Sequence, residues 1–174
     1  LTHFMDEYFK SNHKTVFIWL TPGKGNLEEQ SKEKMDQYIH GSQTKLLSDI
    51  MTDGFEENDA CFINWEKLTK KGNNALKDSE RTNFIEHIRN ALNNGLNFKI
   101  IVDESHQNDT IKADDIIELF HSDKIIRCSA TPKNYKNAIM IDIPEEDVIA
   151  EELIKKLLII NENFEQHISI DDQI

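Results

Sequence analysis

Two adjacent acidic residues, Asp103 and Glu104, follow the apolar run 98–102, and Ser105 and His106 come directly after them. Such apolar runs are typical of buried parallel strands, and open α/β sheets bind ligands at the carboxyl ends of those strands. There Asp103 could hold Mg²⁺ through a bound water, and Glu104 could polarise the water that attacks a terminal phosphate. His106 could link this nucleotide site to a second element. The alternative is an acidic loop that caps the next helix.

A second polar segment, Ser129-Ala130-Thr131, follows the apolar run 124–128. Parallel strands end at the same edge of a sheet, so both segments are expected there. The hydroxyls of Ser129 and Thr131 could bond to His106 or Asp103 and transmit the state of the nucleotide. The alternative is ordinary turn chemistry before Pro132.

The loop 21–26 is the third candidate, and it follows the apolar run 16–20. Backbone amides near a helix N-terminus favour anions, so Thr21, Lys24 and these amides could bind a nucleic-acid phosphate. The loop is not a Walker A motif, because that motif needs GxxxxGK[ST] and Lys24 precedes a glycine. The alternative is a glycine-rich turn from strand to helix, with Asn26 as the helix cap.

Asn64-Trp65-Glu66 follows the short apolar run 60–63. Asn64 could contact a phosphate, and Trp65 could stack on a base, although a place in the core is the favoured interpretation for Trp65. The polar stretch 67–78 is predicted to be a loop, with its lysines mainly in solvent.

The segments that would position these residues alternate between strand and helix patterns. This alternation predicts an α/β fold of three layers, with a mainly parallel sheet and helices on both faces. Gly95 is expected to end the helix before the strand 98–102. The predicted strands are 16–20, 60–63, 98–102, 124–128, 138–142 and 157–161, and the predicted helices are 2–9, 26–38, 45–51, 79–93, 113–120 and 144–156.

Composition narrows the class of protein. The length of 174 residues predicts a single domain over 1–174, and no apolar run is long enough to span a bilayer. A net charge of -12 argues against a general polyanion-binding surface but leaves room for a local basic site. Cys61 and Cys128 are expected to be buried free thiols in a reducing cytoplasm, and their spacing does not favour zinc.

Together these segments resemble the first motor domain of superfamily 2 helicases and translocases. The loop 21–23 with Leu27 and Gln30 is similar to motif Ia, the segment 103–106 to the DExH box, and the segment 129–131 to motif III. Leu27 and Gln30 lie one residue further from the proline than in DEAD-box proteins. Order, strand context and spacing agree, and the resemblance extends over essentially the whole chain.

Within that superfamily the chain most resembles the Res subunit of type III restriction enzymes, through the segments 63–68 and 147–156. The resemblance implies a P-loop NTPase fold of RecA type, with ATP and Mg²⁺ as ligands. It also implies ATP-driven translocation on DNA, most simply double-stranded. The implied roles are magnesium binding for Asp103, catalysis for Asp103, Glu104 and His106, coupling for Ser129 and Thr131, and nucleic-acid binding for Thr21, Pro22, Gly23, Lys24 and Asn64.

Several parts of such an enzyme are expected outside this sequence. The resemblance places the first strand and the Walker A loop upstream of Leu1. It places the second motor domain, with an arginine finger, and the nuclease domain downstream of Ile174. A methyltransferase subunit is a further implied partner. The 174-residue chain alone is therefore expected to hydrolyse ATP poorly.

Two other functional classes stay open at this point. The fold could be a degenerate motor that serves as a non-catalytic scaffold or interaction module. Alternatively, Asp103 and Glu104 could serve another magnesium-dependent phosphotransferase, which nucleic acid would not stimulate.

Overall fold

The computed structural model describes residues 1–23, 25–69, 77–104, 111–132, 136 and 138–151. The chain divides into two compact units, Leu1–Lys133 and Asn134–Ile174, and each is described by itself. The first unit contains the sheet and every candidate site residue. That the whole of 1–174 forms a single domain stays a prediction.

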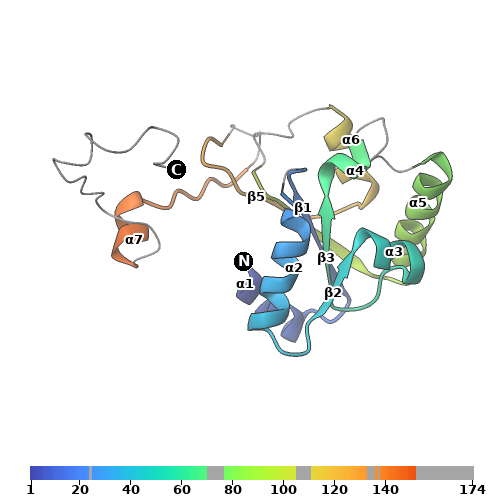
Figure 1. Cartoon of the computed structure of the whole chain (residues 1–174), viewed down its shortest axis with the longest axis horizontal. Coiled ribbons are helices and arrows are strands. Elements are labelled where there is room, and N and C mark those ends of the chain that lie inside the picture. The colour runs from blue at the N-terminus through green and yellow to red at the C-terminus, as the bar shows by residue number, and fades with distance from the viewer. Residues whose placement is uncertain (24, 70–76, 105–110, 133–135, 137, 152–174) are drawn as a thin grey trace, which may run out of the picture. The chain divides into compact units, whose positions relative to one another are not determined.

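The first unit is built on a five-stranded sheet in the order β2-β3-β1-β4-β5. Every neighbouring pair of strands is parallel, which confirms the predicted α/β class. β1 lies at the centre, so the chain passes from the middle of the sheet to one edge, returns, and then crosses to the other edge (Figure 1). The strands are β1 (Thr15–Thr21), β2 (Gln43–Leu46), β3 (Asp59–Asn64), β4 (Asn97–Val102) and β5 (Ile125–Arg127).

Helices cover both faces of this sheet, as predicted. Successive residues of a strand point to opposite faces of the sheet. The buried side chains of the strands therefore fall into two hydrophobic clusters, one on each face. One cluster also takes residues from α3, α4, α5 and α6, and the other takes residues from α1 and α2. The helices of this unit are α1 (Thr2–Ser11), α2 (Leu27–Tyr38), α3 (Leu47–Asp53), α4 (Trp65–Thr69), α5 (Asp78–Asn93) and α6 (Ile111–Leu119).

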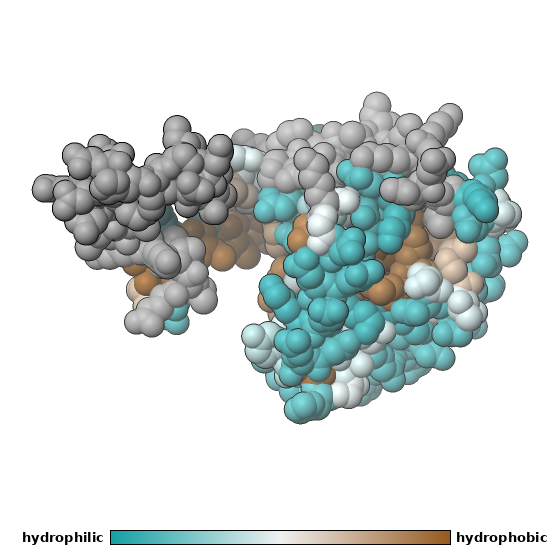
Figure 2. Space-filling model, viewed as in Figure 1, coloured by the Kyte–Doolittle hydropathy of each residue, from teal (hydrophilic) through white to brown (hydrophobic). Residues whose placement is uncertain are grey.

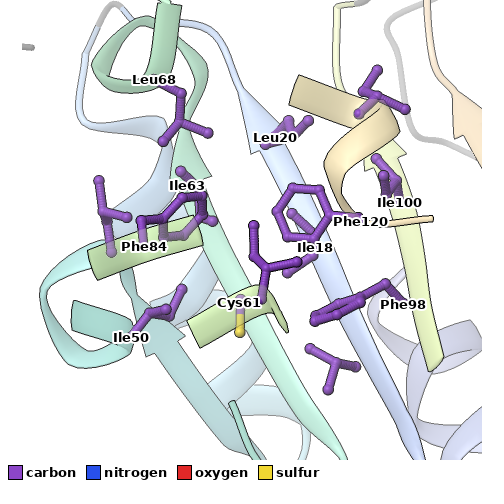
Figure 3. Close-up of a cluster of buried hydrophobic side chains, with 14 of the residues drawn as sticks. Ile18, Leu20, Ile50, Cys61, Ile63, Leu68, Phe84, Phe98, Ile100 and Phe120 are labelled. Atoms are coloured by element: carbon purple, nitrogen blue, oxygen red, sulfur yellow. The ribbon is translucent and has the colours of Figure 1, made fainter. Parts of the chain in front are cut away.

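The larger cluster forms the main core beneath α5 and α6. Ile18 and Leu20 of β1 face Phe98 and Ile100 of β4, and Phe120 lies over them (Figure 3). The ring of Phe120 packs edge-on against Phe98 with centroids 5.1 Å apart. This core holds β1 and β4 rigidly side by side, which is the condition for a precise site at their ends.

The sequence pattern predicted α5 and its end closely. Phe84, Ile88 and Ala91 recur at helical spacing and are all buried. After the last turn Gly95 takes a φ of +80°, a left-handed conformation that glycine adopts without strain. The chain then enters β4 directly.

Two predicted boundaries, at the edge strand β2 and at the loop after α4, are wrong. The segment 45–51 was predicted to be helical, but β2 occupies Gln43–Leu46 and the helix α3 starts only at Leu47. Only four residues pair with β3, and none of them is fully buried, so no apolar run marks this edge strand. The predicted loop 67–78 is also shorter, since α4 extends to Thr69 and α5 begins at Asp78.

Two further expectations are wrong in detail. Asn26 precedes α2 in a left-handed conformation and makes no side-chain cap, while the Gln30 amide donates to the Gly25 carbonyl at 2.7 Å. The predicted strand 138–142 has no regular structure. A strand needs a neighbour for its backbone groups, and the described part of the sheet ends at β5.

The second unit is described only up to residue 151. α7 (Glu145–Ala150) begins one residue later than predicted, with Pro144 as its N-cap residue rather than in its first turn. Its predicted extension to 156 and the predicted strand 157–161 lie outside the described residues. No described helix combines the length and the apolar character needed to cross a membrane.

Candidate functional site

The segments that carry the candidate residues start at the same level along the carboxyl edge of the sheet. Thr21, the last residue of β1, is in register with Asn64 at the end of β3. On the other side, the Asp103 amide donates to the Leu20 carbonyl at 2.9 Å. The Cys128 amide donates to the Val102 carbonyl, also at 2.9 Å. The loops after β3, β1, β4 and β5 therefore start side by side.

The centre of this edge is a topological switch point. The chain leaves β1 toward α2, which packs on one face, and leaves β4 toward α6, which packs on the other. α/β proteins bind their ligands where the loops after neighbouring strands diverge in this way. The loop 21–23 follows one of these two strands, and Asp103 with Glu104 follows the other.

Asp103 and Glu104 form a tight turn at the end of β4. Both side chains are half-buried, and the Glu104 amide donates to Oδ1 of Asp103 at 3.0 Å. Glu104 has a φ of +46°, a conformation that costs energy for a residue with a long side chain. Strained residues of this kind cluster at active sites. His106, the third predicted catalytic residue, lies outside the described residues.

The segment after β5 forms a hydroxyl-stabilised turn. The Thr131 amide donates to Oγ of Ser129 at 3.1 Å, where Ser129 is partly buried and Thr131 is exposed. This is the turn chemistry expected of Ser and Thr before a proline. The turn lies at the same edge of the sheet as Asp103, as a coupling role for Ser129 requires.

The loop after β1 is closely packed. Thr21 is fully buried, and within the described ranges its hydroxyl has no hydrogen-bond partner. Pro22 is buried beside it. Gly23 is partly exposed, and a Cβ there would meet the Glu66 carboxylate group, with Cδ at 2.1 Å. Four residues of this loop were predicted to touch nucleic acid, and of the three that the structure describes only Gly23 is accessible. Lys24 lies outside the described residues.

Asn64 and Trp65 connect β3 to α4. Oδ1 of Asn64 accepts the Glu66 amide at 2.9 Å, so this side chain begins the helix as an N-cap. Asn64 is only 8% exposed, and Trp65 is 2% exposed and belongs to the main core. The favoured interpretation of Trp65 as a core residue is therefore confirmed.

The family model of the type III restriction enzyme res subunit matches residues 1–134. The chain belongs to the type III restriction enzyme res subunit family. Comparisons with curated proteins and with solved structures found no match.

The res-subunit match and the first compact unit cover nearly the same residues, 1–134 and Leu1–Lys133. All of the segments that carry the motif resemblance lie inside both. The family assignment thus applies to the part of the chain that forms the sheet and its carboxyl edge.

Cys128 also lies at this site, whereas the sequence predicted only that it belongs to a core strand. It lies just after β5 and is half-buried. Burial raises the pKa of its thiol, and the nearby carboxylates of Asp103 and Glu104 raise the pKa further. The sequence signal that could have placed Cys128 at this site was its position at the end of the predicted strand 124–128, directly before Ser129.

Few residues at this edge could hold a metal ion directly. In the described ranges, no three His, Cys, Asp or Glu side chains are grouped as metal ligands. A single carboxylate such as Asp103 is nevertheless sufficient for Mg²⁺, because Mg²⁺ keeps several waters and binds through one or two carboxylates plus substrate phosphates. The arrangement fits a Mg²⁺ ion that arrives with a nucleotide.

Proposed function

We propose that this chain is part of an ATP-dependent DNA translocase of a type III restriction system. The carboxyl edge of the sheet would be its nucleotide side. The observation that carries the proposal is that three separately identified segments start at one level, around the switch point of the sheet. The family match over residues 1–134 supports it.

Asp103 and Glu104 would carry the chemistry. When bound, Mg²⁺ would neutralise negative charge on the phosphates of ATP. Asp103 would accept from a water of the ion through Oδ2, while Oδ1 is held by the Glu104 amide. Glu104, which has a left-handed backbone at the end of β4, would take the proton of the attacking water. His106 would complete the site.

The neighbouring loops would link hydrolysis to motion on DNA. The turn held by Thr131 and Ser129 would change with the nucleotide state and pass that change to a second motor domain. Gly23 and Lys24 would contact the DNA backbone, and the buried residues Thr21, Pro22 and Asn64 would hold the neighbouring loops in place. A nuclease domain and a methyltransferase subunit would complete the system.

The test is DNA-stimulated ATP hydrolysis by the natural protein that carries this domain. Glu104→Gln should lower kcat by about 10²–10⁴-fold with little change in KM, because it removes a general base and keeps the shape. The matched control is Glu118→Gln, an exposed glutamate of α6, which should leave kcat unchanged.

Two results would separate this proposal from its competitors. A scaffold function predicts no hydrolysis and no effect of Glu104→Gln. A phosphotransferase that does not act on DNA predicts hydrolysis that DNA fails to stimulate. The 174-residue chain, which contains no GxxxxGK[ST] sequence, is expected to turn over poorly by itself.

A further inference from the structure

A pocket of about 420 Å³ lies beyond β3, on the side of the sheet away from Asp103. It is bounded by the first turn of α2, the start of α3, α4 and the start of α5. Figure 2 shows a hydrophobic area sunk between hydrophilic surfaces in this part of the molecule. No step of the proposed ATP hydrolysis uses this pocket.

A buried carboxylate forms part of its wall. Glu28 is only 4% exposed, and its Oε1 lies 3.0 Å from Nζ of Lys67. Its Oε2 is buried and has no hydrogen-bond partner among the residues that the structure describes. A buried carboxylate oxygen without a donor is destabilising. Lys67 is 42% exposed in its side chain, so solvent screens its charge and it compensates the Glu28 carboxylate only in part.

The charge of the lining is negative. Glu29 and Glu80 join Glu28 in the pocket wall, and Lys67 is the one cation among the described lining residues. Oε2 of Glu80 accepts the Lys77 amide at 2.7 Å, which holds that carboxylate in place. A phosphate would be repelled here, and a cation with N–H donors would be attracted.

The remaining walls decide which cation fits. Leu46, Leu47 and Met51 supply apolar surface. No metal-ligand group occurs in the ranges that the structure describes, so the geometry does not favour an inorganic ion. An arginine side chain combines an apolar stem with a planar, weakly hydrated guanidinium that binds a carboxylate through two parallel bonds. An ammonium is more strongly hydrated and offers no such fork.

We propose that this pocket binds an arginine side chain presented by a partner protein. The guanidinium displaces the Lys67 ammonium and donates to both oxygens of Glu28, while its methylene stem packs against Leu46, Leu47 and Met51. Lys67 thus occupies the site only until the partner binds. The inference uses none of the nucleotide residues, so it stands or fails apart from the proposed function.

The probe is N-acetyl-arginine amide, titrated into the 174-residue chain and followed by amide chemical shifts in NMR. The matched control is N-acetyl-citrulline amide, which has the same length and no charge. We expect the arginine probe to shift the residues lining the pocket and the citrulline probe to leave them unchanged. We also expect the shifts to weaken as salt is added.

Two variants give opposite results if the proposal holds. Glu28→Gln should weaken binding by about tenfold or more, because it removes the charge that the guanidinium recognises. Lys67→Gln should strengthen binding by about tenfold, because it removes the competing cation and leaves Glu28 without a partner. If Glu28→Gln does not fold, as judged by circular dichroism, Lys67→Gln decides the matter.

Several outcomes would overturn the inference. They are equal binding of the citrulline probe, tighter binding of the corresponding lysine amide, and pocket shifts caused by inorganic phosphate. Weaker binding to Lys67→Gln would also contradict it, because Lys67 would then be part of the site rather than its competitor.

Discussion

At the scale of single residues, Cys128 offers a direct chemical readout of the candidate site. Burial raises the pKa of its thiol first, and the carboxylates of Asp103 and Glu104 raise it further. Cys61, the other cysteine, is completely buried and its thiol pKa is raised well above the usual value. Only Cys128 is therefore expected to react with alkylating reagents in the folded chain.

Asp103→Asn and Glu104→Gln should each speed the alkylation of Cys128 by iodoacetamide at fixed pH. Removing a neighbouring negative charge lowers the pKa of the thiol and raises the fraction of thiolate. The measurement is the rate of mass increase at Cys128 by peptide mass spectrometry. Glu118→Gln is the control and should leave the rate unchanged. Equal rates in all variants would show that the carboxylates do not act on the thiol.

The buried hydroxyl of Thr21 is expected to contribute nothing favourable to the stability of the fold. Because this hydroxyl has no partner, Thr21→Val should leave the free energy of unfolding unchanged or raise it by up to about 1 kcal/mol. Thr44→Val is the matched control, since the Thr44 hydroxyl donates to Asp36 at 2.6 Å. That change should cost about 1 kcal/mol in urea unfolding. A large loss of stability in Thr21→Val would mean that its hydroxyl is satisfied in the folded chain.

At the scale of elements, Asp36 ties α2 to the edge of the sheet. Its carboxylate accepts the hydroxyls of Ser42 at 3.0 Å and Thr44 at 2.6 Å, and pairs with Lys32 at 2.7 Å. Burial raises the pKa of Asp36, but these hydrogen bonds outweigh it and hold the pKa below its usual value. The last turn of α2 is thereby linked to the start of β2.

Asp36→Asn should flatten the pH dependence of stability at acid pH. The folded-state pKa is lowered, so the stabilisation is complete above the unfolded pKa of about 4 and is lost as pH falls through the folded pKa. The free energy of unfolding, measured from pH 2.5 to 6, should fall more steeply in the wild type. Glu33→Gln, an exposed change on the same helix, should keep the wild-type slope. Parallel curves for Asp36→Asn and wild type would refute this linkage.

At the scale of the whole molecule, one aromatic group organises the main core. Phe120 lies within 5.1 to 6.5 Å, centroid to centroid, of Phe55, Phe84 and Phe98, and so joins α5, β4 and the end of α6. Phe120 thereby fixes α5 and α6 against β4, the strand that ends just before Asp103.

Phe120→Ala should lower the free energy of unfolding by about 3–5 kcal/mol, because it leaves a cavity among the buried rings. Urea denaturation at neutral pH would measure the loss. Phe4→Ala is the control, since Phe4 is 45% exposed and covers the opposite face. Similar losses in the two variants would mean that the rings around Phe120 do not form the main core.

Much of the architecture could be predicted because its signals are local. Apolar runs marked β1, β3 and β4, and helical spacing with Gly95 marked α5. The edge strand β2 escaped prediction because its four residues pair on one side only and bury no continuous apolar run. The predicted strand 138–142 failed for the converse reason, since apolar residues alone do not supply a partner for the backbone.

The sequence by itself determined the family, the parallel α/β class and the residue types that could do chemistry, since motifs and periodicity are properties of short segments. Tertiary structure decided which of them meet. Register placed Asp103 beside the end of β1, and packing buried Thr21 and Trp65. Packing also brought Glu28 to Lys67 across 39 residues of chain and left Oε2 of that glutamate without a donor. Burial and charge pairing depend on contacts between distant segments, which no local pattern encodes.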